Sequence, residues 1–163
     1  MGLEGQTLAN IIIFAVVAFI VLIAIINRNP SPNRYSLVTQ TGSRGPSTWQ
    51  EAEHFAAQYM RNLGCVDAQV TRQSKDGGID VMSSGYVAQV KHYRGSVGAP
   101  AIQALFGVAR SQNKQALFFT SGTYTREAQQ FASRHVALFV YRADGSVQSA
   151  NGYATHLVNV GLR

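Results

Sequence analysis

The sequence predicts an α/β fold, a mixed central β-sheet flanked by helices, preceded by one transmembrane α-helix. Two wholly apolar runs, 116–120 (ALFFT) and 136–141 (VALFVY), are typical of strands that are buried on both faces of a sheet. Each run follows a stretch with the periodicity of an amphipathic helix, so strands and helices alternate as they do around parallel strands. A tight turn at 83–85 joins two earlier strands, which are therefore expected to be antiparallel.

The elements are expected in the order αβββαβαβ. Helical periodicity predicts helices at 48–63, 100–111 and 125–135. Alternating or wholly apolar runs predict strands at 66–71, 79–82, 86–90, 116–120 and 136–141. Ser47 or Thr48 can cap the first helix, and Gly64 ends it. We expect one domain over 48–145, which residues 146–163 extend by an edge strand or a short helix.

Residues 8–26 are almost wholly apolar. At about 1.5 Å per residue this stretch is roughly 28 Å long, close to the thickness of a bilayer core, so we expect a transmembrane helix. A cleaved signal peptide is the competing interpretation, but no Lys or Arg precedes the stretch and no small-x-small cleavage site follows it. Arginines follow the stretch, whereas Glu4 is the only charged side chain before it, so the positive-inside rule places the carboxyl-terminal domain in the cytoplasm. We therefore expect a single-pass protein of the plasma (inner) membrane, with residues 1–7 as a short extracytoplasmic tail.

Residues 27–47 contain three of the four prolines and lack helical or strand periodicity, so they are expected to form a flexible linker. The formal charge of +6 favours a partner rich in phosphate, either nucleic acid or an anionic membrane surface. The single cysteine, Cys65, excludes an internal disulfide, and the scattered histidines do not have the spacing of zinc ligands.

The hairpin at 79–90 carries an acid, an amide and, just after it, an amine that can converge. Asp80 lies at the start of its first strand, while Gln89 and Lys91 alternate along the second strand and project from one face. The Asp80 carboxylate, the Gln89 side-chain oxygen and the backbone carbonyl of Val90 are oxygen ligands of the kind that Mg²⁺ takes. Such a cation polarises a phosphate, and Lys91 would counter the charge that develops during hydrolysis. Spacing alone leaves open a solvated hairpin whose Asp and Lys are ordinary surface charges.

These residues carry a resemblance to a known family. The run Asp76-Gly77-Gly78-Ile79-Asp80, followed by Gln89-Val90-Lys91, resembles the catalytic domain of Mrr-type (type IV) restriction endonucleases. That family is a branch of the PD-(D/E)xK nucleases in which Gln replaces the middle acid. The resemblance covers about residues 48–145, including the strand end at Phe118-Phe119-Thr120-Ser121 and the helix from Tyr124 to Ala132. It implies a restriction-endonuclease-like fold.

The resemblance also implies an activity, a Mg²⁺-dependent (or Mn²⁺-dependent) endonuclease that restricts foreign DNA. Asp80 and Gln89 would lie at the metal and Lys91 at the attacking water. A glutamate of the first helix is implied beside the metal; we place it at Glu53, with Glu51 as the second candidate, because the two flank the apolar stripe on opposite sides. A second acid would compensate for the neutral Gln89. The expected substrate is double-stranded DNA, and cutting both strands would require two active sites and hence a homodimer.

Further residues are expected to support DNA binding. Contacts to phosphates, or a role as isolated surface cations, are predicted for Arg72, Lys75, Arg94 and Arg110. The resemblance places Gln103 at a supporting polar position.

Two other residues are expected to be structural: His92, which faces away from Lys91, and Trp49, which is expected to pack on the sheet. The alternative function is a catalytically inactive nucleic-acid-binding or scaffolding module, tethered to the membrane, that keeps the fold without turnover.

Overall fold

The computed structural model describes residues 44–71 and 78–162, which lie in one compact unit spanning Tyr35–Arg163. The predicted transmembrane helix at 8–26 and the linker up to residue 43 are outside the described residues, as are Arg72 and Lys75. Among the described residues, no helix has the length and apolar character needed to cross a bilayer. The membrane span therefore stays a prediction from the sequence.

The elements follow the predicted order, with short additions. In chain order they are α2 (Trp49–Asn62), β1 (Gln69–Val70), β2 (Val81–Met82), β3 (Tyr86–Lys91), β4 (Ser96–Val97), α3 (Ala99–Ser111), β5 (Gln115–Thr120), β6 (Thr123–Tyr124), α4 (Arg126–Ala132), β7 (Val136–Tyr141), β8 (Val147–Ser149) and α5 (Gly152–Val160). The mixed sheet and its flanking helices confirm the predicted α/β class. The additions are β4, β6, β8 and α5, so the carboxyl-terminal residues form both an edge strand and a helix.

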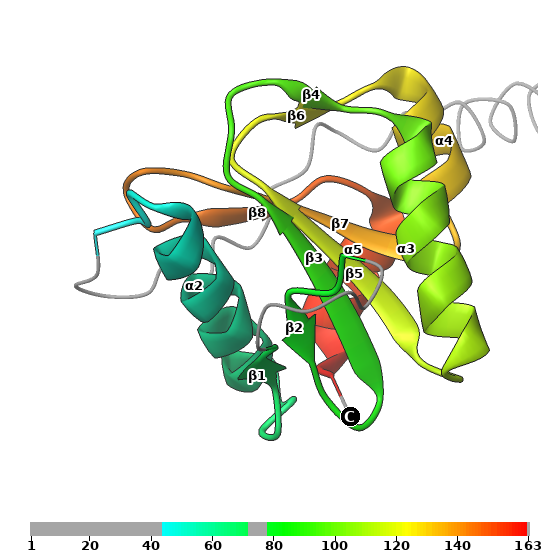
Figure 1. The fold of residues 1–163 in the computed structure, drawn as a ribbon, viewed down its shortest axis with the longest axis horizontal. Helices are drawn as coiled ribbons and strands as arrows, with labels where there is room; N and C mark the ends of the chain where they lie inside the picture. Colours follow the sequence, from blue (N-terminus) through cyan, green and yellow to red (C-terminus); the bar gives the residue numbers. More distant parts are fainter. Residues whose placement is uncertain (1–43, 72–77, 163) are drawn as a thin grey trace, which may run out of the picture. The chain divides into compact units, whose positions relative to one another are not determined.

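The main sheet of the described residues has six strands in the order β1-β2-β3-β5-β7-β8. The central strands β3, β5 and β7 are parallel, and the outer pairs are antiparallel. β3 and β5 are in register from Tyr86 opposite Gln115 to Lys91 opposite Thr120, so both strands end at the same edge of the sheet. β4 and β6 form a separate parallel pair beyond this edge (Figure 1).

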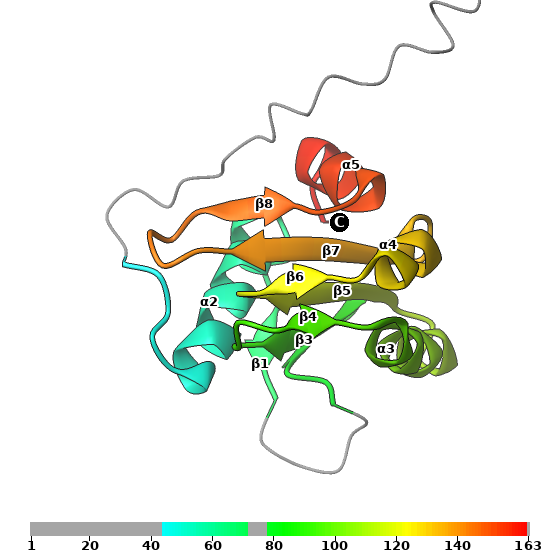
Figure 2. The same cartoon turned by 90° about the horizontal axis from the view of Figure 1, so that it is seen from above.

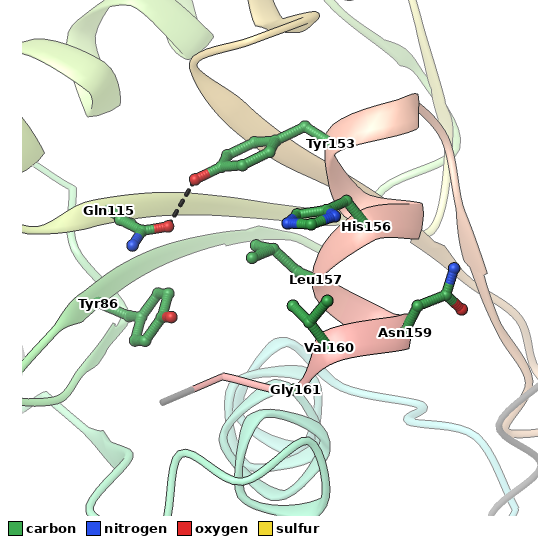
Figure 3. Close-up of a pocket in the computed structure, with 8 residues that line it drawn as sticks. All are labelled: Tyr86, Gln115, Tyr153, His156, Leu157, Asn159, Val160 and Gly161. Atoms are coloured by element: carbon green, nitrogen blue, oxygen red, sulfur yellow. Dashed lines mark hydrogen bonds between the residues drawn. The ribbon is translucent and has the colours of Figure 1, made fainter.

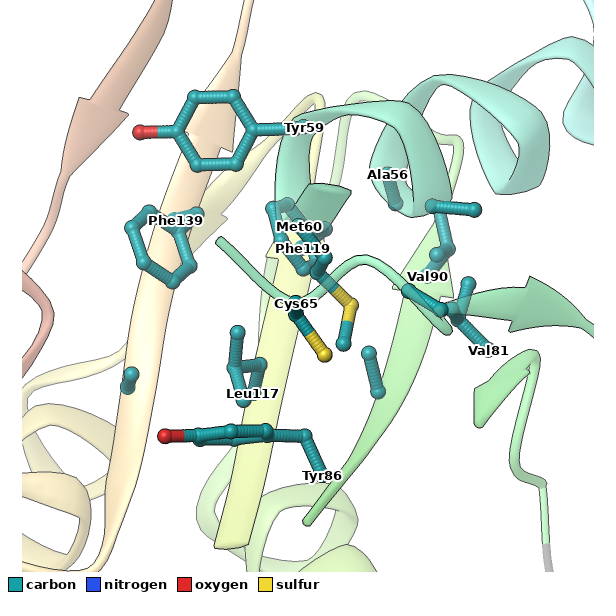
Figure 4. Packing of buried hydrophobic residues seen from close by; sticks show 14 of the residues in the cluster. Ala56, Tyr59, Met60, Cys65, Val81, Tyr86, Val90, Leu117, Phe119 and Phe139 are labelled. Carbon is teal, nitrogen blue, oxygen red and sulfur yellow. The ribbon is translucent and has the colours of Figure 1, made fainter. Parts of the chain in front are cut away.

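Helices cover both faces of the sheet. α2 and α5 lie on one face, and α3 and α4 lie on the other (Figure 1, Figure 2). On the α2 face, the ring of Tyr59 packs edge-on against Phe119 of β5 and Phe139 of β7, whose own rings stack with centroids 4.9 Å apart (Figure 4). All three side chains are fully buried. This aromatic cluster fixes α2 across the parallel strands.

The opposite face has its own core, beneath α3 and α4. Tyr124 of β6 is buried there, and its hydroxyl lies 2.9 Å from the carbonyl oxygens of Phe118 and Phe139. A buried hydroxyl with such partners stabilises the fold instead of costing desolvation energy. The contact ties the small β4–β6 pair to the ends of the main strands.

Three local details differ from the sequence prediction. α4 ends at Ala132, three residues before the predicted end at 135, because residues 133–135 form a turn. β4 and β6 are two residues long each, too short to give a periodic pattern. Trp49 is 46% exposed and does not pack on the sheet, since it lies in the first turn of α2 beside the capping residue Thr48.

Candidate active site

β2 and β3 separate at Asp80, and the fork is defined here by this residue together with Gln89, Val90 and Lys91 of β3. The backbone N–H of Asp80 donates to the carbonyl of Ala88 at 2.9 Å, one residue out of the register that pairs Val81 with Ala88, so the regular antiparallel ladder ends here. The N–H of Val90 then donates to the side-chain Oδ2 of Asp80 at 2.7 Å. The carboxylate therefore takes the place of a backbone carbonyl and is held in position by β3 itself.

Backbone direction brings the Val90 carbonyl to the same opening. In an extended strand, the N–H and C=O of one residue point toward the same neighbouring strand. The Val90 N–H points to Asp80, whereas the Lys91 carbonyl accepts a bond from the Ser121 N–H, on the β5 side, at 3.1 Å. The Val90 carbonyl hence faces the open side of the fork, where the Asp80 carboxylate lies.

The Gln89 side chain lies over Gly78, at the entry to β2. Gly78 has a φ of +81°, and a Cβ at this position would meet Gln89 Nε2 at 2.6 Å. Both the backbone conformation and the close approach favour glycine. Thr71 holds the same segment: its N–H donates to the Asp80 carbonyl at 2.9 Å, and its hydroxyl donates to the Ile79 carbonyl at 2.7 Å. The Gln89 amide is thereby positioned against the residues that lead into Asp80.

Lys91, the last residue of β3, is exposed at the end of the strand. Its side chain alternates with that of Val90 and so projects from the same face as Gln89. The positive charge of Lys91 lowers the pKa of Asp80, although burial has the larger, opposite effect. An ammonium group is thus available to an anionic ligand at the fork.

Of the two candidate glutamates of α2, Glu53 lies near the fork. It is half-buried, and its pKa is raised first by burial and then by the negative charge of Asp80. Glu51 is exposed and forms a capping box: the Ser47 N–H and hydroxyl donate to its Oε2 at 2.7 and 2.8 Å, and its own N–H donates to Thr48 Oγ1 at 3.2 Å. Glu53, and not Glu51, is therefore the helix glutamate that Asp80 affects.

The electrostatics of Glu53 and Asp80 suit a divalent cation. Burial raises the pKa of Asp80 more than the Val90 N–H bond and the Lys91 charge lower it. Two half-buried acids, of which Asp80 raises the pKa of Glu53, together with amide and carbonyl oxygens match the hard oxygen ligands that Mg²⁺ takes. The part of the chain that the structure describes contains no group of three or more His, Cys, Asp or Glu side chains placed to hold a metal. The Gln89 and Val90 oxygens would therefore have to complete the ligand set.

The residues predicted to contact DNA are not all at this edge of the sheet. Arg72 and Lys75 lie outside the described residues. Arg94 follows β3 and lies at the edge where the parallel strands end, and Gln103 is exposed in the first half of α3. Arg110 is not brought together with Arg94, because it lies in the last turn of α3, at the opposite edge where β5 begins. This position fits the alternative of an isolated surface cation.

A pocket of ≈ 610 Å³ lies away from the fork, between α5 and the starts of β3 and β5 (Figure 3). The Tyr153 hydroxyl donates to Gln115 Oε1 at 2.5 Å, and Tyr86, His156 and Val160 line the same space. Tyr86 is the first residue of β3 and the fork is at its end, so the length of the strand separates the two places. This pocket contains none of the predicted site residues.

The sequence gives no sign of two contacts that shape the fork. The pattern around Thr71 predicts only a strand residue, not its hydrogen bond to the Ile79 carbonyl. A hydrogen bond from a backbone N–H, such as that of Val90 to Asp80, cannot be predicted from the residue type. The glycine pair at 77–78 is the one available signal, since it marks a place where the backbone needs room.

Comparison with known proteins gives one match. The sequence model of the Mrr catalytic domain, described as a restriction endonuclease, matches residues 46–143, which is more than half of the chain and contains the whole fork. No curated protein and no solved structure gives a significant match. The match agrees with the resemblance that the sequence motifs carry and with the mixed sheet between layers of helices. The chain therefore belongs to the Mrr-type restriction endonucleases, a family of nucleases whose substrate is DNA.

Proposed function

We propose that this protein is a membrane-anchored, Mg²⁺-dependent (or Mn²⁺-dependent) DNA endonuclease that hydrolyses phosphodiester bonds at the fork and restricts foreign DNA. The observation that supports this most strongly is the Asp80 carboxylate, which is half-buried, bonded to the Val90 N–H at 2.7 Å and close enough to Glu53 to raise its pKa. If the hairpin were solvated and its charges ordinary surface charges, the pKa values of Asp80 and Glu53 would stay near those of free carboxyl groups.

The residues of the fork have separate roles in this proposal. Asp80, Glu53, the Gln89 side chain and the Val90 carbonyl hold the cation, which supplies Lewis acidity at the scissile phosphate. Lys91 orients the attacking water and stabilises the negative charge that grows on the phosphate oxygens. Because Lys91 is exposed and points away from the Val90 side chain, it can approach a phosphate while the ligands stay in place.

The proposal places the domain at the cytoplasmic side of the plasma membrane. The apolar stretch at 8–26 supports an anchor, and the arginines after it support the orientation. A flexible linker over 27–47 would have a root-mean-square span of roughly 25 Å, which keeps the domain close to the bilayer. The proposed substrate is double-stranded DNA, and a second copy of the chain would supply the active site for the other strand.

Plasmid cleavage by the full chain, kept in detergent, tests the proposal. The wild type is expected to nick supercoiled plasmid with Mg²⁺ or Mn²⁺ and to be inactive in EDTA. Asp80→Asn is expected to be inactive with either metal, because it removes a charged ligand. Metal-independent cleavage, or unchanged cleavage by Asp80→Asn, would contradict the assignment. A gel shift without cleavage under any divalent cation would favour the inactive binding or scaffolding module.

A further inference from the structure

A second pocket, of ≈ 430 Å³, opens at the sheet edge where the parallel strands end. It is called the strand-end pocket here. Most of its lining residues end or follow those strands, and Pro46, which precedes α2, completes the lining: His92, Tyr93 and Arg94 after β3, Ser121 after β5, and Tyr141, Arg142 and Ala143 at the end of β7. Open α/β sheets commonly bind ligands outside the carboxyl ends of their parallel strands. The position alone makes this pocket a candidate for a ligand that the fork does not hold.

His92 and Tyr141 form a fixed surface in the strand-end pocket. Their rings are parallel within 7°, and the Tyr141 hydroxyl lies 3.0 Å from His92 Nδ1. Tyr141 is buried against Phe55 of α2, and burial raises the pKa of its hydroxyl to about 12, so the hydroxyl stays protonated at neutral pH. The Ser121 hydroxyl donates to the Tyr93 carbonyl at 3.1 Å. The structural role predicted for His92 agrees with these contacts, which hold the polar groups in place.

The strand-end pocket is positively charged. Arg94 and Arg142 are both exposed, and no Asp or Glu is found among its described lining residues. Asp144, in the turn after β7, accepts bonds from the Ser146 N–H and hydroxyl at 2.9 and 2.7 Å. These bonds, and then the charge of Arg142, lower the pKa of Asp144, so its carboxylate offsets part of the Arg142 charge and leaves Arg94 without a described acidic neighbour in the pocket lining. Guanidinium groups bind anions with several oxygen acceptors, above all phosphates and carboxylates. The pocket therefore suits a phosphate group.

We propose that the strand-end pocket binds a backbone phosphate of the DNA strand, one that flanks the scissile phosphate at the fork. The two places share β3, because Lys91 of the fork directly precedes His92 of the pocket. The Tyr93 ring, 44% exposed, lies over Gly95, where a side chain would clash with it, so the segment that carries Arg94 has little room to rearrange. The inference rests on the proposed nuclease function and adds a positioning contact outside the chemistry.

Binding of a short fluorescein-labelled DNA duplex to the full chain, in EDTA so that cleavage does not interfere, tests this inference. Arg142→Ala and Arg94→Ala are each expected to raise the Kd about tenfold and to reduce the slope of log K against log salt by about 1, because each removes one phosphate contact. Arg110→Ala is the matched control, since it removes an arginine at the opposite edge of the sheet. Its Kd is expected to equal that of the wild type.

Two results of this binding assay would overturn the inference. One is a wild-type Kd for both Arg142→Ala and Arg94→Ala; the other is an equal loss of affinity in Arg110→Ala, which would show that only overall charge matters. Both pocket arginines are exposed, so melting temperatures equal to that of the wild type are expected and show that the fold is intact.

The phosphate in the strand-end pocket could belong to a DNA strand or to a free nucleotide, and binding of a mononucleotide distinguishes the two. Calorimetric titration with dAMP is expected to give only weak binding. Tight binding of dAMP that Arg142→Ala abolishes, with duplex binding unchanged, would replace the DNA strand by a free nucleotide as the ligand. Cleavage assays in parallel keep the two proposals apart: Arg142-dependent binding without metal-dependent cleavage refutes the nuclease alone, and cleavage with Arg142-independent binding refutes the pocket alone.

Discussion

In the proposed active site, the Asp80 carboxylate has both a structural and a chemical task. One oxygen accepts the Val90 N–H and closes the end of the antiparallel ladder, so the other oxygen can face a cation without losing the orientation of the side chain. Glu53 belongs to α2, and its pKa is raised first by burial and then by the negative charge of Asp80. At the scale of single residues, the fork is an electrostatic arrangement that a divalent ion would relieve.

Substitutions of the two glutamates of α2 should have different effects, one on cleavage and the other on stability. Glu53→Gln is expected to lower Mg²⁺-dependent cleavage by about 100-fold and to abolish the rise in melting temperature that Mg²⁺ causes, because it removes a ligand. Glu51→Ala is the control: it breaks the capping box with Ser47 and Thr48, so it should lower the melting temperature and leave cleavage unchanged. The opposite pattern, with cleavage lost only in Glu51→Ala, would assign the helix acid to Glu51.

The raised pKa values of Asp80 and Glu53 predict how stability depends on pH. A carboxyl group whose pKa is raised by folding contributes stability in full below its unfolded pKa of about 4, and loses that contribution as pH rises through the folded value. Asn does not titrate. In metal-free buffer, the melting temperature of Asp80→Asn minus that of the wild type should therefore be larger at pH 8 than at pH 4. Thermal unfolding followed by circular dichroism at both pH values measures the difference. A difference in melting temperature that is smaller at pH 8 than at pH 4 would contradict the electrostatic account.

At the scale of elements, the fork depends on the close approach of two strands. Gly78 leaves room for the Gln89 side chain and adopts a left-handed backbone conformation, while Thr71 holds the adjoining segment. β3 then supplies alternate side chains to the site and to the core, since Ala88 and Val90 pack toward α2. The hairpin is thus specified by backbone geometry as much as by its polar residues.

Gly78→Ala should disturb both the stability and the activity of the hairpin. The left-handed φ of +81° should cost about 1–2 kcal/mol with a Cβ present. The new Cβ would also displace Gln89, which is expected to lower cleavage by about tenfold or more. Gly107→Ala in α3 is the matched control, because nothing lies within 4 Å of its Cβ and alanine is the better helix former. Chemical denaturation and plasmid cleavage measure both effects; equal behaviour of the two variants would argue against this role for Gly78.

The elements also show what the sequence can and cannot predict. Long periodic or wholly apolar segments, such as 116–120 and 136–141, lead to the correct strands because burial on both faces dictates their composition. The strands β4 and β6 carry no such pattern, and their pairing depends on the folded sheet beneath them. At the proposed site, motif and spacing predict Asp80, Gln89 and Lys91, and the structure brings Asp80 to the part of β3 that carries the other two. Residue spacing alone could not decide between Glu53 and Glu51, because that choice depends on how α2 packs and is capped.

At the scale of the molecule, three parallel strands end at one edge of the sheet. Lys91 of the fork directly precedes His92 of the strand-end pocket, and this topology brings Ser121, Tyr141 and Arg142, which lie far along the chain, to the same edge. Arg110 and the pocket around Tyr153 lie at the other edge, so the two ends of the sheet differ in chemistry. The proposed membrane anchor, which is inferred from the composition of residues 8–26, would make this edge of the sheet bind DNA near the membrane.

The most direct test of the proposed active site is the single-turnover cleavage rate of Lys91→Ala, measured beside its melting temperature with and without Mg²⁺. We predict that the rate falls by about 100- to 1000-fold, because charge stabilisation at the phosphate is lost. Mg²⁺ should still raise the melting temperature as in the wild type, because Lys91 is not a ligand. Asp80→Asn should lose both the cleavage and the thermal response. Cleavage by Lys91→Ala at the wild-type rate would contradict the assignment of the fork as the active site.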